Sequence, residues 1–170
     1  MRRIALAFAL LALAACSPAK KAEDSGLSPE AQKNEAAGAA FLAKNAKEPG
    51  VVTTASGLQY KIVHEGPAGG YHPKGEDDVR VNYEGTLLDG TVFDSSYQAG
   101  MPVVFRLHTL IPAWVEGIAL MKPGDEFMMY VPAKLAYGDD GAGKIPPGST
   151  LVFKIELLGV LRADGGVAQG

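Results

Sequence analysis

Between residues 57 and 158 apolar and polar residues alternate with a period of two in several short runs, and this feature constrains the fold most strongly. Such alternation is typical of β-strands that bury one face and expose the other. Turns rich in Gly and Pro separate the runs. We expect strands over residues 58–63, 79–84, 91–93, 103–107, 127–131 and 151–158.

One stretch of this region has helical spacing instead. Residues 112–121 place Trp114, Ile118 and Met121 on one face, and Pro123-Gly124 ends the helix. Strands that bury one face need a covering layer, which this helix can supply. The sequence therefore predicts an α+β domain over residues 51–162. In it, an antiparallel sheet of about five strands curls around one short helix, and a further helix precedes the domain.

Two connections carry specific signals. Asp89-Gly90 lies between two apolar runs and predicts a two-residue hairpin turn. Residues 137–149 form a long loop rich in Gly and Pro that contains two large apolar residues, Tyr137 and Ile145. Loops of this length without regular structure are often functional. Residues 163–170 are expected to be a flexible tail.

The first residues resemble a targeting signal. Arg2 and Arg3 precede an apolar run over residues 4–15, which is too short for a membrane-spanning helix of about 20 residues. The run ends at Cys16, the only cysteine, and residues 13–16 (LAAC) resemble a bacterial lipobox. We expect a signal peptide over residues 1–15 and acylation of Cys16. The alternative is an ordinary signal peptide that is cleaved elsewhere.

An acylated Cys16 would place the protein in the cell envelope, anchored by lipid and facing the periplasm. Ser17 follows the cysteine where an Asp would indicate retention in the inner membrane, so we expect the outer membrane. Residues 16–27 are polar and charged, as expected of a lipid-anchored linker.

A helix is predicted within residues 28–50, because Ser28 and Pro29 form a typical helix start and Pro49-Gly50 a stop. Its apolar stripe is thin, and Gly38 in mid-helix costs about 1 kcal/mol relative to Ala. We expect a stripe of Ala36, Ala40 and Ala43. The neighbouring Phe41 and Leu42 would contact either the domain or a second chain, and we expect a monomer or a weak dimer.

Composition excludes several classes of protein. The net charge of −3 and the lack of a basic stripe argue against a nucleic-acid partner. A single cysteine allows neither an internal disulfide nor a cysteine-based metal site. His64, His72 and His108 lack the spacing of metal ligands and are expected at the surface. No Ser/Cys–His–acid motif of a hydrolase is recognisable, and we expect no cofactor.

The order of motifs over about residues 57–160 resembles that of FKBP-type peptidyl-prolyl cis/trans isomerases. The resemblance rests on VNYEG at 81–85, DGTVFDSS at 89–96, LIPAWVEG at 110–117, LAYG at 135–138, and IPP at 145–147 followed by LVF at 151–153. Residues 54–60 (TASGLQY) are similar to the macrophage-infectivity-potentiator branch of that family, whose members carry a helical N-terminal extension.

The resemblance implies catalysis of X-Pro isomerisation by a pocket, without covalent chemistry or a metal, on proline-containing polypeptides. The residues that it implies for catalysis are Tyr83, Phe93, Asp94 and Tyr137. Those that it implies for substrate binding are Leu110, Ile111, Trp114, Ile145 and Phe153. A macrolide would be a further ligand of the same pocket.

Each of these residues also has a plain structural interpretation. Trp114, Phe153 and Tyr83 could be core residues, and Asp94 could cap the turn before Ser95-Ser96. Ile145 has no evident structural reason in a loop of Gly and Pro. At the level of the whole protein, the alternative to an isomerase is a non-catalytic periplasmic holdase chaperone that uses the same cleft.

The chain departs from the usual family pattern at three positions. Val103 stands where a pocket-wall aromatic is frequent, and Ala99 where an arginine often pairs with the pocket aspartate. Lys144 stands where an apolar residue is common, and the preceding loop lacks the family's frequent histidine. These departures predict a less restrained Asp94, a wider pocket and weaker macrolide binding, with catalysis less affected.

Overall fold

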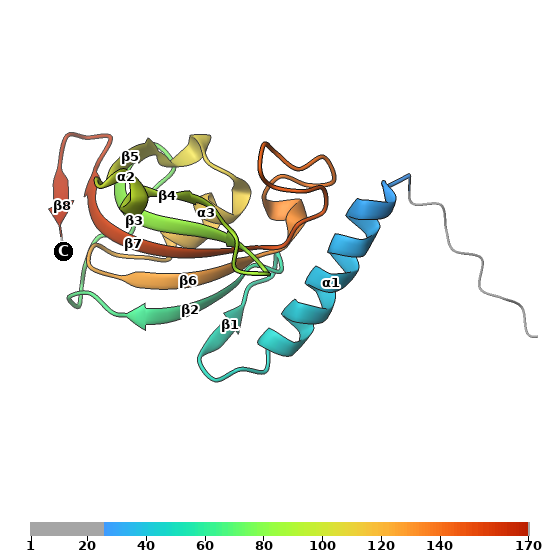
Figure 1. Cartoon of the computed structure of the whole chain (residues 1–170). Helices are drawn as coiled ribbons and strands as arrows, with labels where there is room; N and C mark the ends of the chain where they lie inside the picture. The colour runs from blue at the N-terminus through green and yellow to red at the C-terminus, as the bar shows by residue number, and fades with distance from the viewer. Residues whose placement is uncertain (1–25, 170) are drawn as a thin grey trace, which may run out of the picture.

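The computed structural model describes residues 26–169. Three α-helices, two short 3₁₀ helices (η) and eight strands follow one another in these residues, as Figure 1 shows. In chain order they are α1 (Pro29–Asn45), β1 (Val51–Thr53), β2 (Gln59–His64), β3 (Asp78–Leu87), β4 (Val92–Ser95), α2 (Ser96–Ala99), β5 (Val103–Arg106), η1 (Leu107–Thr109), α3 (Pro112–Ala119), β6 (Glu126–Val131), η2 (Ala133–Leu135), β7 (Leu151–Leu161) and β8 (Val167–Gln169).

All the strands pair in an antiparallel sheet with the order β1-β2-β6-β7-β3-β4, while β5 joins β3 and β8 joins β7. The two longest strands, β3 and β7, pair along their whole shared length at its centre. The predicted fold class is confirmed. The sheet has more strands than the five or so predicted, because β1 and β8 are only three residues long and leave little periodicity to detect.

The core lies between the sheet and α3, which packs inside the curve of the sheet (Figure 1). The predicted inward positions of β3 and β7 are buried, as are those of α3. On β2 the prediction is only partly right, because Leu58, just before the strand, is buried whereas Ile62 is 47% exposed. In α3, Gly117 has no side chain, which leaves room for Met129 of β6 against the helix.

Helix α1 begins as predicted, since the Ser28 hydroxyl accepts a hydrogen bond from the Ala31 N–H at 3.1 Å. The predicted stripe is wrong, because Ala36, Ala40 and Ala43 are all exposed. The buried residues are instead Ala31, Gly38 and Asn45, each seven positions from the next. Gly38 is therefore a point of close approach to the domain, because a Cβ atom there would lie 2.1 Å from Thr150 Oγ1. This explains a residue that looked merely costly in sequence.

The partner of α1 in this structure is its own domain. The Phe41 ring lies 5.8 Å from the Tyr130 ring of β6, centroid to centroid. The Gln59 side chain of β2 donates to the Leu42 carbonyl oxygen at 2.9 Å. Figure 1 shows α1 beside one end of the sheet, next to the loop that precedes β7.

The turn between β3 and β4 differs from the predicted two-residue hairpin. The Leu87 N–H donates to the Thr91 oxygen at 2.9 Å, and the Gly90 N–H donates to the Leu87 oxygen at 3.0 Å. The loop therefore has three residues, 88–90, and Gly90 at its end has a φ of 87°. This is the hairpin in which a type I turn is followed by a left-handed residue, for which Gly is suited.

Residues 163–169 are not the flexible tail that was predicted. β8 pairs with the end of β7, with Val160 opposite Ala168. The Ala163 N–H also donates to the buried Asp77 carboxylate at 2.9 Å.

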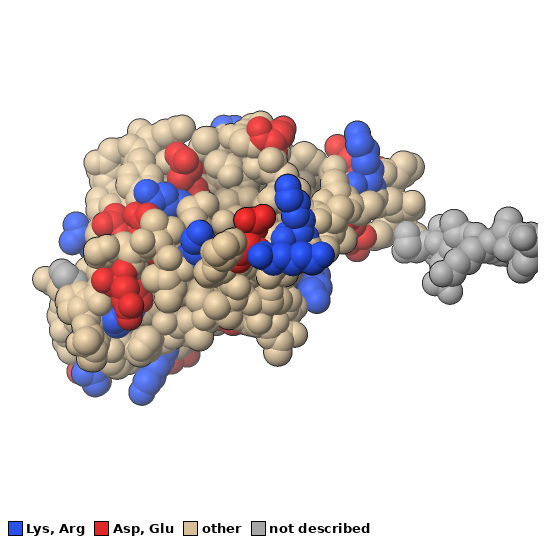
Figure 2. Space-filling view, turned by 90° about the horizontal axis from the view of Figure 1, so that it is seen from below, with Lys and Arg blue, Asp and Glu red and all other residues tan. Residues whose placement is uncertain are grey.

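No helix within residues 26–169 is both long and apolar enough to cross a bilayer. On the face in Figure 2, acidic and basic side chains are interspersed, which gives that face no field of a single sign.

Candidate active site

A cavity of about 380 Å³ opens beside α3. Eight of the nine predicted pocket residues line it, together with two others. The lining residues come from β3, β4, β5, the η1–α3 segment, the loop after η2, and β7: Tyr83, Phe93, Asp94, Phe105, Thr109, Leu110, Ile111, Trp114, Tyr137 and Phe153. Segments that are up to 70 positions apart in sequence, from Tyr83 to Phe153, therefore meet at one place.

Trp114 is the centre of the pocket's aromatic floor. Its ring makes edge-to-face contacts with Tyr83, Phe105 and Phe153, at centroid distances of 5.1, 5.9 and 5.3 Å. Phe93 extends the cluster by an edge-to-face contact with Phe153 at 5.6 Å. Pairs with this geometry are favourable beyond their buried area, so the floor is both apolar and rigid.

The floor closes at Gly85, for a reason that the motif alone does not reveal. Gly85 in β3 pairs with both Asp94 of β4 and Phe153 of β7. A Cβ atom at Gly85 would lie 2.5 Å from the Phe93 ring and 2.8 Å from the Phe153 ring. Only a glycine lets the two rings meet above this strand.

Tyr83 and Asp94 form a polar pair at the edge of the floor. The Tyr83 hydroxyl donates to Asp94 Oδ2 at 2.6 Å. Burial, and then this hydrogen bond and the Asp94 charge, raise the pKa of the Tyr83 hydroxyl well above its ordinary value. Asp94 does not cap the following turn, because Ser95 supplies the cap to α2. Among residues 26–169 no basic side chain forms a hydrogen bond or an ion pair with Asp94, and Ala99 stands where the family often has an arginine.

Besides the buried indole N–H of Trp114, which has no hydrogen-bond partner among residues 26–169, two donors at the wall and rim of the pocket are unpartnered there. One is the backbone N–H of Ile111, the residue before the first turn of α3. The other is the Tyr137 hydroxyl, on a side chain that is 39% exposed at the rim. Polar groups in an apolar pocket favour a ligand that can accept their hydrogen bonds. An amide carbonyl is such a ligand.

Ile145 is the predicted pocket residue that is not among those lining this cavity. Its side chain is 7% exposed and belongs to the main hydrophobic core. Its backbone forms two hydrogen bonds with Ala142, at 2.9 and 2.8 Å, which close a tight turn in the loop. The expectation that Ile145 lacks a structural reason is therefore wrong.

Phe105 and Thr109 line the pocket but were not predicted as site residues. Phe105 shares its strand face with Val103, so the period of two could have suggested that it points inward. Thr109 lies in the 3₁₀ helix η1, and no pattern in the sequence marks it. It reaches the pocket only because η1 turns the chain between β5 and α3.

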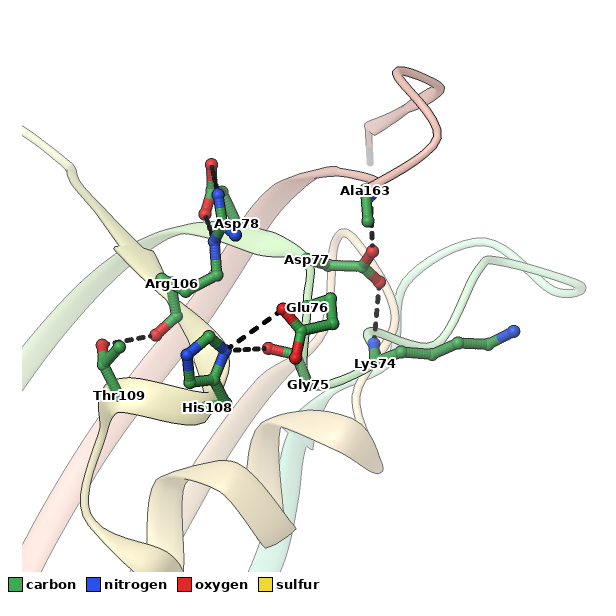
Figure 3. A network of polar contacts seen from close by, with 9 residues as sticks. All are labelled: Lys74, Gly75, Glu76, Asp77, Asp78, Arg106, His108, Thr109 and Ala163. Carbon is green, nitrogen blue, oxygen red and sulfur yellow. Dashed lines mark hydrogen bonds and ion pairs between the residues drawn. The ribbon is translucent and has the colours of Figure 1, made fainter.

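A network of polar contacts joins η1 to the segment that precedes β3 (Figure 3). The backbone N–H groups of Leu107 and His108 donate to the oxygens of Asp77 and Gly75, both at 3.0 Å. The Thr109 hydroxyl donates to the Arg106 oxygen at 2.7 Å. The segment that carries the pocket wall is thereby joined to the start of β3.

Asp77 is the buried anchor of this network. Its carboxylate accepts hydrogen bonds from the Lys74 N–H, the Tyr71 hydroxyl and the Ala163 N–H, at 2.8, 2.8 and 2.9 Å. Burial alone would raise the pKa of the Asp77 carboxyl, but these donors outweigh it and hold the pKa below its ordinary value. The group is therefore charged at neutral pH and joins three segments of the chain.

The three histidines are exposed, as predicted. Within residues 26–169 no group of three or more His, Cys, Asp or Glu side chains is arranged to hold a metal ion. Cys16 lies outside the described residues.

The sequence matches two family models. One, described as FKBP-type peptidyl-prolyl cis-trans isomerase, covers residues 69–158. The other, described as the domain amino terminal to FKBP-type peptidyl-prolyl isomerase, covers residues 9–62 and so includes β1 and the first part of β2. The fold, the pocket and these matches define the class, and the chain belongs to the FKBP-type peptidyl-prolyl cis-trans isomerase family.

Relatives of known name match most of this chain at nearly half of its aligned positions. The FKBP-type peptidyl-prolyl cis-trans isomerase FkpA of Aeromonas hydrophila is 48% identical over 142 residues, which make up 82% of this chain and 52% of that protein. The outer membrane protein MIP of Legionella longbeachae is 47% identical over 135 residues, 79% of this chain and 57% of that protein. The chain thus spans about half the length of the curated relatives that it matches.

Solved structures agree. Escherichia coli FkpA matches with a TM-score of 0.74 and 49% identity, over 76% of this chain and 60% of that one. A peptidyl-prolyl cis-trans isomerase from Pseudomonas syringae matches with a TM-score of 0.71 and 32% identity, over 84% of this chain and 98% of that one.

Proposed function

We propose that this protein is a peptidyl-prolyl cis/trans isomerase that assists the folding of envelope or secreted proteins. The observation that carries the proposal is the aromatic pocket, which combines a rigid apolar floor with two unpartnered donors at its wall and rim. Rotation about an X-Pro bond faces a barrier of roughly 20 kcal/mol, because the planar amide loses its resonance. No bond is made or broken, so the reaction needs neither a nucleophile nor a general base.

An apolar pocket lowers this barrier because the twisted amide is less polar than the planar one. Leaving water therefore favours the transition state over the ground state. In this proposal Trp114, Phe93 and Phe153 hold the proline ring, and Leu110 flanks it. A macrolide would bind at the same place, with an affinity reduced by the absence of an aromatic at Val103.

The polar groups of the pocket orient the substrate. The Tyr137 hydroxyl and the Ile111 N–H would donate to carbonyl oxygens of the substrate. Asp94 would lie near the rotating carbonyl, held in place by its hydrogen bond from Tyr83. Holding the peptide in this way fixes one side of the bond while the other side turns.

We propose a cell-envelope location, with a signal peptide over 1–15, a linker over 16–27 and a lipid anchor on Cys16 that faces the periplasm from the outer membrane. The lipobox-like residues 13–16 support the anchor. The Legionella longbeachae relative is named as an outer membrane protein, which supports the location. The domain itself would span residues 51–169, since β8 belongs to the sheet.

A protease-coupled assay with a proline-containing peptide tests the activity. The full chain without its signal peptide should accelerate cis-to-trans conversion in proportion to its concentration. The same preparation, tested for suppression of aggregation of an unfolded protein, separates the isomerase from a holdase. A protein that suppresses aggregation but leaves the isomerisation rate at its uncatalysed value would refute the proposal.

A further inference from the structure

The loop that carries Tyr137 folds back on itself. Residues 136–150 connect η2 to β7, and Tyr137 lies at the beginning of this loop. The Gly148 N–H, near its end, donates to the Gly138 oxygen at 3.0 Å. Gly138 directly follows Tyr137, so the place of Gly148 helps to determine where the tyrosine lies.

Helix α1 contacts the returning half of this loop. Asn34 Nδ2 donates to the Pro147 oxygen at 2.8 Å. A Cβ atom on Gly148 would lie 2.5 Å from the Ala31 oxygen, and one on Gly38 would lie 2.1 Å from Thr150 Oγ1. The helix residues 31, 34 and 38 are three and four positions apart and so share one face. Figure 1 shows the loop lying along α1.

The other end of α1 is attached to the sheet independently of the loop. Asn45 Nδ2 donates to Gln59 Oε1 at 2.8 Å, and Gln59 Nε2 donates to the Leu42 oxygen at 2.9 Å. Phe41 packs against Tyr130 of β6. The helix therefore joins a rigid part of the fold to a surface loop.

We propose that α1 braces the rim of the pocket, and that Asn34 is a positioning residue for Tyr137. This inference rests on the proposed isomerase function. The connection runs from Asn34 through the Pro147 carbonyl and the Gly148 N–H to the Gly138 carbonyl beside Tyr137. Surface loops are mobile unless they are tied down, and a small displacement of an orienting group is costly to turnover. The helix that precedes the domain is thus part of the working site.

The decisive variants are Asn34→Ala and Asn34→Asp. The aspartate keeps the shape but presents acceptors where the Pro147 carbonyl needs a donor. Both should lower kcat/KM for a proline peptide about two- to tenfold, as expected for one lost hydrogen bond, with little change in Tm. Gln32→Ala is the matched control, because Gln32 lies on the same helix but its side chain donates to the Leu27 oxygen and not to the loop. It should leave kcat/KM unchanged.

A double-mutant cycle with Tyr137→Phe tests whether Asn34 acts through the tyrosine. If it does, Asn34→Ala in the Tyr137→Phe background should cause no further loss of kcat/KM. Losses that multiply in the double variant, or a wild-type rate for Asn34→Ala, would overturn the proposal.

Hydrogen exchange of the Gly148 amide gives a readout that does not depend on activity. Exchange should be faster in Asn34→Ala than in the wild type and unchanged in Gln32→Ala. Equal protection in all three proteins would refute the brace. Gly148 exchange is then compared with activity. If exchange is faster in Asn34→Ala than in the wild type, but the wild type has no isomerase activity, the proposed function and the role in turnover are refuted and the brace itself is supported.

Discussion

The Tyr83 hydroxyl donates a 2.6 Å hydrogen bond to Asp94 Oδ2, which holds a carboxylate at the open edge of an aromatic pocket. Tyr83 is almost fully buried, whereas Asp94 is exposed. The buried partner therefore orients the exposed one. A tyrosine hydroxyl has an ordinary pKa of about 10, and burial raises the pKa of Tyr83 further, so this group is protonated and able to donate throughout the physiological range.

Removing polar groups from the rim should reduce activity without unfolding the domain. Tyr137→Phe leaves the apolar floor and the described hydrogen bonds intact, so its Tm should stay close to that of wild type. Asp94→Ala also leaves the floor intact and the domain folded, but it removes the acceptor of the buried Tyr83 hydroxyl and should lower Tm by an amount that corresponds to about 1–3 kcal/mol. Loss of one orienting hydrogen bond is worth about 1–3 kcal/mol, or about one to two decades in kcat/KM. Tyr97→Phe, at an exposed tyrosine outside the pocket, is the control. Wild-type turnover in both rim variants would contradict the assignment.

Gly85→Ala should damage both the fold and the pocket. Its methyl group would collide with the Phe93 and Phe153 rings, and overpacking of this kind costs about 1–3 kcal/mol. We expect a lower urea midpoint and a lower kcat/KM. In Gly75→Ala the new methyl would meet His108 Cβ at an ordinary 3.7 Å, so stability should change little. Equal stability of the two variants would show that the rings can separate at no cost.

Asp77→Asn should destabilise the protein in a pH-dependent way. The pKa of Asp77 is lower in the folded state than its unfolded value of about 4, so its stabilisation is present above that pH. It is lost as the pH falls through the folded-state pKa. At pH 7 the NH₂ group of the asparagine would face a backbone N–H donor. The free energy of unfolding, measured by urea denaturation, should therefore fall by about 1–3 kcal/mol. The difference from wild type should shrink below about pH 4.

The neighbouring Asp78→Asn serves as the control for Asp77. Asp78 forms a partly exposed ion pair with Arg106, and pairs of this kind contribute less than about 1 kcal/mol. The anchoring role would be contradicted if Asp77→Asn lowered the free energy of unfolding no more than Asp78→Asn does. It would also be contradicted if the decrease in Asp77→Asn were the same at pH 3 as at pH 7.

Cys16→Ala should release the protein from the membrane. Two or three acyl chains give stable anchoring, whereas one alone would be marginal. After cell fractionation, the wild type should be found with the outer membrane and the variant with the soluble periplasmic fraction. Ser17→Ala should leave the wild-type distribution unchanged. A soluble wild type would exclude the lipid anchor.

The mature protein should be a monomer or a weak dimer. The buried face of α1, formed by Ala31, Gly38 and Asn45, is used against its own domain. The exposed Ala36, Ala40 and Ala43 offer a second chain little apolar area. Analytical ultracentrifugation over a hundredfold range of concentration should show mostly monomer at the low end. A dimer that persists at every concentration would contradict this expectation.

The sequence by itself determined the class of fold and most of the site. Alternation on β3 and β7 and the helical face of α3 are local patterns, and they place Tyr83, Phe153 and Trp114 on inward positions without any knowledge of the tertiary structure. Motifs such as residues 89–96 added Phe93 and Asp94, because the order of such motifs is specific to a family.

Only the tertiary structure decided the contacts between segments that are distant in sequence. Gly38 looked like a weak point of a helix but is the contact with Thr150, and Ile145 looked like a loop residue without a structural reason but is buried in the core. Gly85 became intelligible only when Phe93 and Phe153 met above it. In each case the role of the residue depends on what approaches it from another part of the chain, and periodicity describes only the residue's own element.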